Sequence, residues 1–134
     1  MPLLRWLPEY SVNEAGLDND HKKMFDILNT VYENVMNSLD VDCVLPLIDE
    51  LSEHTKYHLS AEERHMKEVG FQGIDAHIAE HREFTHKIEA LRTRFHGNNL
   101  EVARELIILL GDWLLRHVLM EDKKYSGLSA VIEV

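Results

Sequence analysis

Apolar residues recur at intervals of three and four positions in four separate stretches of the chain, the spacing that gathers side chains on one face of an α-helix. The stretches run from Asp18 to Leu39, from near Asp42 to Gly70, from about Asp75 to Phe95, and from near Asn99 to His117. The chain shows none of the period-two alternation of a half-buried strand. Four such helices joined by short turns pack as an antiparallel bundle, so we predict an all-α, up-down-up-down four-helix bundle.

Residues that favour helix ends refine these boundaries. Asp18 or Asp20 is predicted to cap the first helix, because a short acidic side chain can accept hydrogen bonds from the free N–H groups of a first turn. Asp75 is predicted to cap the third helix in the same way. Gly70 is expected to end the second helix, since glycine readily adopts the left-handed conformation that closes many helices.

The residues before the first helix lack a helical period and contain two prolines, yet they include several large apolar side chains. We therefore expect residues 1–17 to form an extended N-terminal arm along the bundle. A length of 134 residues with 45% hydrophobic content suffices for one core. We expect a single domain, with the bundle over about 18–122 and a C-terminal tail over 123–134.

The first residues contain no apolar run long enough for a signal peptide or a membrane span, and the single cysteine, Cys43, permits no internal disulfide. A cytoplasmic location fits both features. The formal net charge of −10 disfavours nucleic acid and anionic membranes as partners, because both bind basic surfaces. No surface patch stands out as an interface, so we expect a monomer and not an oligomer.

The chain contains nine histidines, and histidine is the commonest protein ligand for transition metals. Five of them fall on helix faces that should be apolar. His58 lies four residues before Glu62, and His77 lies four before His81, so each pair projects from one face of its helix. The other two, on the first and fourth helices, are His21 and His117. All four helices therefore direct imidazole or carboxylate groups toward the interior.

Glu62 lies on an inward face, where an unpaired negative charge is costly. A metal ion would supply the compensating charge. Two ions can be served if Glu62 bridges them and a second carboxylate bridges beside it. Asp122 is the candidate for that role, because it lies five residues after His117, just past the regular helical pattern, where the chain can turn back toward the site. Residue types alone permit iron, manganese, cobalt or zinc.

These residues, taken in order, resemble the motifs of the hemerythrin family. The motifs are Trp6–His21 (WLPEYSVNEAGLDNDH), His58-Leu-Ser-Ala-Glu62-Glu63, His77-Ile-Ala-Glu-His81 and His117-Val-Leu-Met-Glu-Asp122. The resemblance extends from Trp6 to about Tyr125 and implies two iron ions, Fe2+ or Fe3+, joined by an oxo or hydroxo bridge. It implies that one iron is bound by His77, His81 and His117 and the other by His21 and His58, with Glu62 and Asp122 bridging both.

The resemblance also implies a function. The second iron would keep an open position for dioxygen, so we expect reversible oxygen binding for transport, storage or delivery, and no enzymatic activity. Delivery would make an oxygen-consuming enzyme the protein's partner. The residues expected to line the oxygen pocket are Phe25, Leu59, Trp113 and Leu114. The family usually has phenylalanine where this chain has Leu59, and the smaller leucine is expected to widen the pocket.

Other assignments of the same residues are open. Ferritin-like di-iron proteins use a Glu-x-x-His motif on each of two helices and a glutamate on each of the others. The residues that could form such a set are Glu62 with His65, Glu83 with His86, Glu33 and Glu105. That set would indicate a di-iron oxidase, whereas an oxygen or redox sensor or a peroxidase would use the hemerythrin-like site. We expect His54, His65, His86 and His96 to be outer hydrogen-bonding or exposed residues, and Glu63 to point away from the metal.

Overall fold

The computed structural model describes residues 3–12, 14–38, 44–94 and 100–125. Its main helices are α1 (Ala15–Glu33), α2 (Val44–Glu68), α3 (Ile74–Arg94) and α4 (Leu100–Asp112). The shorter segments are the 3-10 turns η1 (Pro8–Tyr10) and η5 (Asp122–Tyr125) and the π-helical η2 (Asn34–Ser38) and η4 (Trp113–Glu121). The described residues contain no strand, which confirms the predicted all-α class. The parts of the predictions that lie outside the described residues are residues 1–2 and 13 of the arm, Leu39, Asp42, Cys43, Phe95, His96, Asn99 and 126–134.

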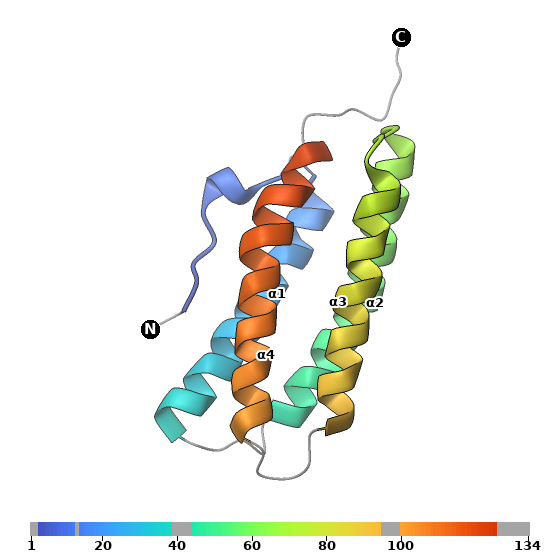
Figure 1. The fold of residues 1–134 in the computed structure, drawn as a ribbon. Helices are drawn as coiled ribbons and strands as arrows, with labels where there is room; N and C mark the ends of the chain where they lie inside the picture. Colours follow the sequence, from blue (N-terminus) through green and yellow to red (C-terminus); the bar gives the residue numbers. More distant parts are fainter. Residues whose placement is uncertain (1–2, 13, 39–43, 95–99, 126–134) are drawn as a thin grey trace.

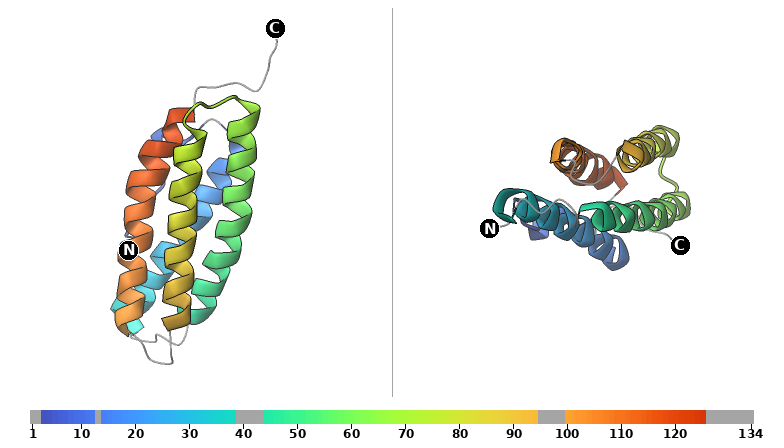
Figure 2. Two further views of the ribbon diagram at one scale, coloured as in Figure 1. Left: turned by 45° about the vertical axis from the view of Figure 1, so that its right-hand side comes forward. Right: turned by 90° about the horizontal axis from the view of Figure 1, so that it is seen from below.

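The helices run alternately up and down around a shared interior (Figures 1 and 2). α1 contacts α2 and α4, and α3 contacts the same two helices, so every helix packs between two antiparallel neighbours. The predicted bundle topology is therefore confirmed. As a consequence, the start of α1, the end of α2, the start of α3 and the end of η4 meet at one end of the bundle, the upper end in Figure 1.

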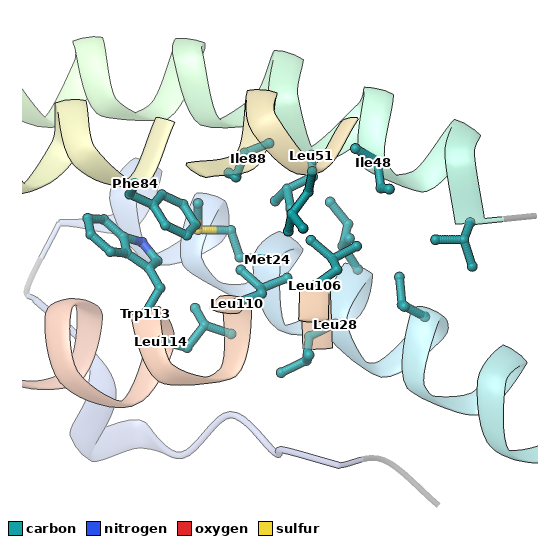
Figure 3. Close-up of a cluster of buried hydrophobic side chains, with 14 of the residues drawn as sticks. Met24, Leu28, Ile48, Leu51, Phe84, Ile88, Leu106, Leu110, Trp113 and Leu114 are labelled. Atoms are coloured by element: carbon teal, nitrogen blue, oxygen red, sulfur yellow. The ribbon is translucent and has the colours of Figure 1, made fainter. Parts of the chain in front are cut away.

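Below that end, the interior of the bundle is apolar (Figure 3). All four helices contribute side chains that are at most 1% exposed, among them Met24, Leu28, Ile48, Leu51, Ile88, Leu106 and Leu110. Full burial of one such side chain stabilises the fold by about 1.5–3 kcal/mol. These apolar layers hold the helices in fixed rotation, and that rotation decides which polar residues face the interior.

A tight turn sets α3 antiparallel to α2. Gly70 has a φ of +68°, and the N–H of Phe71 donates to the carbonyl of Met66 while the N–H of Gly70 donates to that of Lys67. This pair of bonds is the Schellman motif, which satisfies carbonyls at a helix end. The predicted end of the second helix at Gly70 is confirmed. α3 then starts at Ile74, so Asp75 lies within its first turn and is not its cap.

The start of α1 differs from the prediction. The helix begins at Ala15, and the N-cap is Glu14, whose carboxylate accepts hydrogen bonds from the N–H groups of Gly16 and Leu17. The predicted cap Asp18 instead accepts hydrogen bonds from the hydroxyl of Ser11 and the N–H of Val12. Both acidic residues could cap a helix. Asp18 bonds residues of the arm, and Glu14 caps the helix.

The N-terminal arm lies along the bundle as predicted (Figure 1). The Trp6 ring packs edge-on against Phe25 of α1 at a centroid distance of 5.5 Å. Asn29 of α1 accepts hydrogen bonds from the N–H groups of Leu3 and Leu4 and donates to the carbonyl of Leu4. The arm is shorter than the predicted 1–17, because α1 takes up its last residues, and it contains the turn η1.

Candidate metal centre

The seven side chains predicted as ligands lie together at the upper end of the bundle, and each is at most 3% exposed. They are His21 of α1, His58 and Glu62 of α2, His77 and His81 of α3, His117 of η4, and Asp122 at the start of η5. Residues four apart on an α-helix share a face. The spacing therefore explains why His58 and Glu62, like His77 and His81, face the interior together.

The spacing of five residues between His117 and Asp122 has a different structural basis. On an α-helix, residues five apart point about 140° away from each other. The chain is π-helical over Trp113–Glu121, and the N–H of Asp122 donates to the carbonyl of His117. A π-helical turn closes over five residues, so it carries both side chains to the same face. We predicted that the chain turns back after a regular helix, and the structure achieves this with a π-helix.

Glu62 lies between two groups of histidines. Its Oε1 is 2.9 Å from Nε2 of His77 and 2.8 Å from Nε2 of His81. Its Oε2 is 3.5 Å from Nε2 of His21 and 3.3 Å from Nε2 of His58. One carboxylate therefore directs one oxygen at each group, which is the arrangement that a bridging ligand requires.

Asp122 spans the same two groups from the other side. Its Oδ1 is 2.7 Å from Nε2 of His77 and 3.1 Å from Nε2 of His117, and its Oδ2 is 3.2 Å from Nε2 of His21. The Nε2 atoms of His81 and His117 also face each other at 3.1 Å. Two ligand atoms at right angles around one metal ion, each bonded to it at about 2.1 Å, lie roughly 3 Å apart. All these separations between nitrogen and oxygen atoms are near that value.

Two sets of donor atoms are compact enough to hold a metal ion, each with all its ligand atoms within 4.8 Å of one another. The larger set is Glu62, His77, His81, His117 and Asp122, and the smaller is His21, His58, Glu62 and Asp122. The two sets share only the carboxylates. The arrangement can therefore serve two neighbouring ions, one with three imidazoles and one with two.

Several buried nitrogen and oxygen atoms of the cluster make no hydrogen bond within the protein. They are both ring nitrogens of His21, Nε2 of His58, and both carboxylate oxygens of Asp122. A buried polar group without a partner costs free energy. Except for Nδ1 of His21, these atoms belong to the two donor sets just described, so metal ions would satisfy them, and the residues fit the group that the sequence motifs imply.

The cluster shifts the acid–base behaviour of its members. Burial alone would raise the pKa of Glu62, but the imidazoles close around its carboxylate hold that pKa well below its usual range. The nearby imidazoles of His21, His77 and His117 lower the pKa of Asp122, although burial and the charge of Glu62 act to raise it. Burial opposes a charged imidazole, but the carboxylates raise the pKa of His58 and of His77 to about 9 and that of His117 to about 10.

Three carboxylates that sequence reasoning missed lie behind the histidines. Each accepts a hydrogen bond from the Nδ1 atom of an inward histidine, and the pairs are Asp20 with His58 at 3.0 Å, Glu63 with His81 at 3.0 Å, and Glu80 with His117 at 3.2 Å. Glu63 is in neither donor set, in line with the prediction that it points away from the metal, but its contact with His81 was not predicted. Asp20 was a predicted helix cap, but it lies one turn inside α1, and the bond from His58 holds its pKa below the usual range despite its burial.

A sequence signal could have revealed these three carboxylates. Each one is the immediate neighbour of an inward residue: Asp20 precedes His21, Glu63 follows Glu62, and Glu80 precedes His81. Spacing along a single helix does not indicate their partners, because each partner lies on the next helix.

The four residues predicted to line an oxygen pocket are buried, and all four belong to the main apolar core cluster. Trp113 stacks face to face on His117 at 3.8 Å and on Phe84 at 4.0 Å (Figure 3 shows the second contact). Leu59 borders a groove between α2 and α3 that also reaches His81. Phe25 also packs against the Trp6 ring of the N-terminal arm, and Leu114 is fully buried. Their role as an oxygen pocket is still a prediction.

The ferritin-like set of residues is not brought together. Glu83 and His86 are exposed, Glu83 pairs with Lys87, and Glu105 pairs with Arg94. Within the described residues, Glu62 is the one member of the ferritin-like set in the two donor sets, which include none of Glu33, Glu83, Glu105, His65 and His86. His54 is an outer hydrogen-bonding residue as predicted, because its Nε2 donates to the carbonyl of Asp20.

In the part of the chain that the structure describes, no helix is both long enough and apolar enough to cross a membrane.

Comparison with known proteins gives one consistent result. Residues 14–128 match the family model described as the hemerythrin HHE cation binding domain. The chain is 28% identical over 124 residues to a bacteriohemerythrin of Clostridium acetobutylicum, covering 90% of this chain and 96% of that protein. It is 28% identical over 127 residues to a bacteriohemerythrin of Methylococcus capsulatus, covering 94% and 96%. The crystal structure of a wild-type hemerythrin has the same fold, with a TM-score of 0.78 at 24% identity, covering 96% of this chain and 99% of that one.

Proposed function

The chain belongs to the hemerythrin family, and from this premise we propose that it binds dioxygen reversibly at a non-haem di-iron centre inside the bundle. One observation carries the proposal: five buried imidazoles and two buried carboxylates form two donor sets that share only the carboxylates. A structural histidine cluster would not require two carboxylates that each face both groups.

The proposed ligands divide by their contacts. One iron would be held by His77, His81 and His117, and the other by His21 and His58. Glu62 and Asp122 would bridge them, in line with the contacts of each carboxylate to both groups of histidines. The iron with two imidazoles has fewer protein ligands and is the one with room for an added small molecule.

When bound, the iron pair would supply electrons that dioxygen takes up and would regain them on release. The protein's part is to keep the ligands mostly neutral and the site dry. Imidazole is neutral as a ligand, and only two of the seven inner side chains carry negative charge. The ring of Trp113 lies flat on His117 and limits the movement of that imidazole. The walls proposed for the oxygen pocket are Phe25, Leu59, Trp113 and Leu114.

We propose a carrier or local supplier of oxygen and not an enzyme. Oxygen-activating di-iron sites in ferritin-like bundles use four glutamates and two histidines. The inner ligand set here has more histidines and fewer carboxylates. Negative ligands stabilise high-valent iron, so a set with fewer of them favours oxygen binding over oxygen activation.

Oxygen cycling tests the proposal. The protein is loaded with iron, reduced without oxygen, exposed to air, and purged again while its visible absorption spectrum is recorded. We expect a charge-transfer band to develop on exposure and to fade on purging through repeated cycles. If air drives the protein directly to an oxidised form that purging does not reverse, the centre is a redox or oxidase site and the carrier proposal fails. Zinc-loaded protein is the control, since zinc has no redox chemistry and should stay colourless.

A further inference from the structure

The three outer carboxylates, Asp20, Glu63 and Glu80, are arranged in a regular pattern around the bundle. Asp20 of α1 bonds a histidine of α2, Glu63 of α2 bonds one of α3, and Glu80 of α3 bonds one of η4. Each hydrogen bond thus crosses one of the three consecutive helix interfaces, always toward the next helix in the chain. In each of α1, α2 and α3, one turn directs a proposed ligand to the centre and an outer carboxylate to the next helix.

These hydrogen bonds determine which nitrogen of each imidazole faces the interior. A carboxylate can only accept, so the Nδ1 atoms of His58, His81 and His117 carry the protons. Their Nε2 atoms lie 3.3 Å and 2.8 Å from oxygens of Glu62 for the first two, and 3.1 Å from Asp122 for the third. A carboxylate behind an imidazole also makes the opposite nitrogen a stronger donor to a metal.

We propose that Asp20, Glu63 and Glu80 are positioning residues that hold three histidines in the metal-binding orientation and set the metal affinity and reduction potential of the centre. The inference rests on the proposed function, because it concerns the same centre. Three further negative charges next to mostly neutral inner ligands favour the more positive, ferric state. The outer carboxylates therefore lower the reduction potential that the inner ligand set alone would give.

The three positions differ in how well they are shielded from water. The exposed fraction of the carboxylate side chain is 18% for Asp20, 29% for Glu63 and 43% for Glu80. Glu80 also makes the longest of the three bonds. Because water screens a charge, we infer that Asp20 has the largest effect and Glu80 the smallest. Asp20 is also the only one of the three that supports the group containing His21 and His58.

Glu83 offers a matched control for these substitutions. It lies on α3, three residues after Glu80, and its exposed side chain pairs with Lys87 at 3.0 Å. Glu83→Gln therefore removes the same unit of charge from the same helix without touching the cluster. Asp20→Asn keeps an oxygen that can accept a hydrogen bond but removes its charge, whereas Asp20→Ala removes both.

The test measures metal retention and potential. Wild type and the variants Asp20→Asn, Asp20→Ala, Glu63→Gln, Glu80→Gln and Glu83→Gln are loaded with cobalt(II), and the loss of its visible absorption to a chelator is timed. Loss of a carboxylate behind a metal-bound histidine typically costs about 10–100-fold in affinity. We expect a faster loss of that order for Asp20→Asn, a still faster one for Asp20→Ala, smaller effects for Glu63→Gln and then Glu80→Gln, and none for Glu83→Gln. The midpoint potential of the iron-loaded proteins should rise in the same order.

Each outcome decides the matter. If the variants of Asp20, Glu63 and Glu80 lose cobalt as slowly as Glu83→Gln and have the same midpoint potential as Glu83→Gln, the positioning role is refuted. This holds even if wild type binds oxygen reversibly. If wild type holds cobalt tightly but its iron form does not bind oxygen reversibly, the proposed function fails while the graded variants still support the positioning role. If wild type holds no metal, both fail. Far-ultraviolet circular dichroism of each variant shows whether a loss reflects unfolding.

Discussion

His81 and Glu83 lie two residues apart on α3, yet their environments are opposite. His81 is 1% exposed and its Nε2 lies 2.8 Å from Glu62, whereas the Glu83 side chain is 66% exposed and pairs with Lys87. We expect His81→Ala to lose most of its iron and Glu83→Ala to keep a wild-type content, because only the first removes a donor from the proposed centre. Iron content per chain after anaerobic loading measures this. Equal loss from both variants would contradict the proposed ligand set.

Leu59 follows His58 and borders a groove that reaches His81. A phenylalanine there would fill more of the space between α2 and α3 and slow the access of water. We expect Leu59→Phe to autoxidise more slowly than wild type, measured as the rate at which the oxygenated protein converts to the ferric form in air. The same rate in both proteins would show that Leu59 does not limit access.

At the scale of single residues, the sequence predicted the inward position of all seven proposed ligands. Six of the seven lie at an α-helical spacing from an apolar stripe or from another ligand, so the local pattern contains the information. Asp122 does not, and it was predicted only from its position just past the regular helical pattern. The hydrogen bonds of Asp20, Glu63 and Glu80 could not be predicted in this way. Their partners lie on the next helix, and which residues meet there depends on how far the helices are rotated and shifted.

At the scale of the helices, a substitution of Gly70 tests the turn that makes α3 antiparallel to α2. Its φ of +68° lies in the left-handed region, and a Cβ there would meet nothing within 4 Å, so any cost of a side chain comes from the backbone. We expect Gly70→Ala to lower the free energy of unfolding by about 1 kcal/mol. Urea denaturation of the metal-free protein measures it.

The control for that substitution is Gly111, which lies within α4 and also has nothing within 4 Å of a built Cβ. Alanine in a helix interior is more stable than glycine by about 0.5–1 kcal/mol. Gly111→Ala should therefore stabilise the protein. A loss of stability at Gly111, or none at Gly70, would show that backbone conformation does not explain these two glycines.

The helices themselves were predicted, and their details were not. Periodicity located four helices, but it did not locate the cap of α1, which was predicted at Asp18 or Asp20 and is Glu14. Asp18 accepts hydrogen bonds from Ser11 and Val12 of the N-terminal arm, and a helical pattern does not indicate contacts with residues outside the helix. The π-helix over Trp113–Glu121 was also missed, because its five-residue turn becomes evident only when His117 and Asp122 must face the same site.

For the molecule as a whole, the buried cluster predicts a pH dependence of stability in the metal-free protein. The pKa values of His58, His77 and His117 rise from 6.5 in the unfolded chain to about 9, 9 and 10. Their contribution to stability is therefore complete below about pH 6.5 and is lost as the pH rises through 9 to 10. Glu62 and Asp122 have lowered pKa values, so their contribution is present above about pH 4.5 and is lost on further acidification.

We expect the urea midpoint of the metal-free protein to be highest between these limits and to fall steadily from pH 6.5 to pH 10. The iron-loaded protein is the control, because a bound metal keeps its histidine ligands neutral and should remove most of the alkaline loss. A metal-free midpoint that stays constant over this range would contradict the proposed stabilisation of charged histidines by Glu62 and Asp122.

The whole fold was the most predictable level. Four amphipathic helices with short connections leave few ways to bury their apolar faces, and the antiparallel bundle follows from this. The bundle in turn places the start of α1, the end of α2, the start of α3 and the end of η4 at one end. This arrangement brings together residues as far apart in the chain as His21 and Asp122.

The most direct test of the proposed centre is anomalous X-ray diffraction at the iron absorption edge, from crystals of the iron-loaded protein. The proposed ligand set predicts two iron peaks inside the bundle, one beside His77, His81 and His117, one beside His21 and His58, with Glu62 and Asp122 in contact with both. A single peak, or iron bound beside Glu83 and His86, would contradict it.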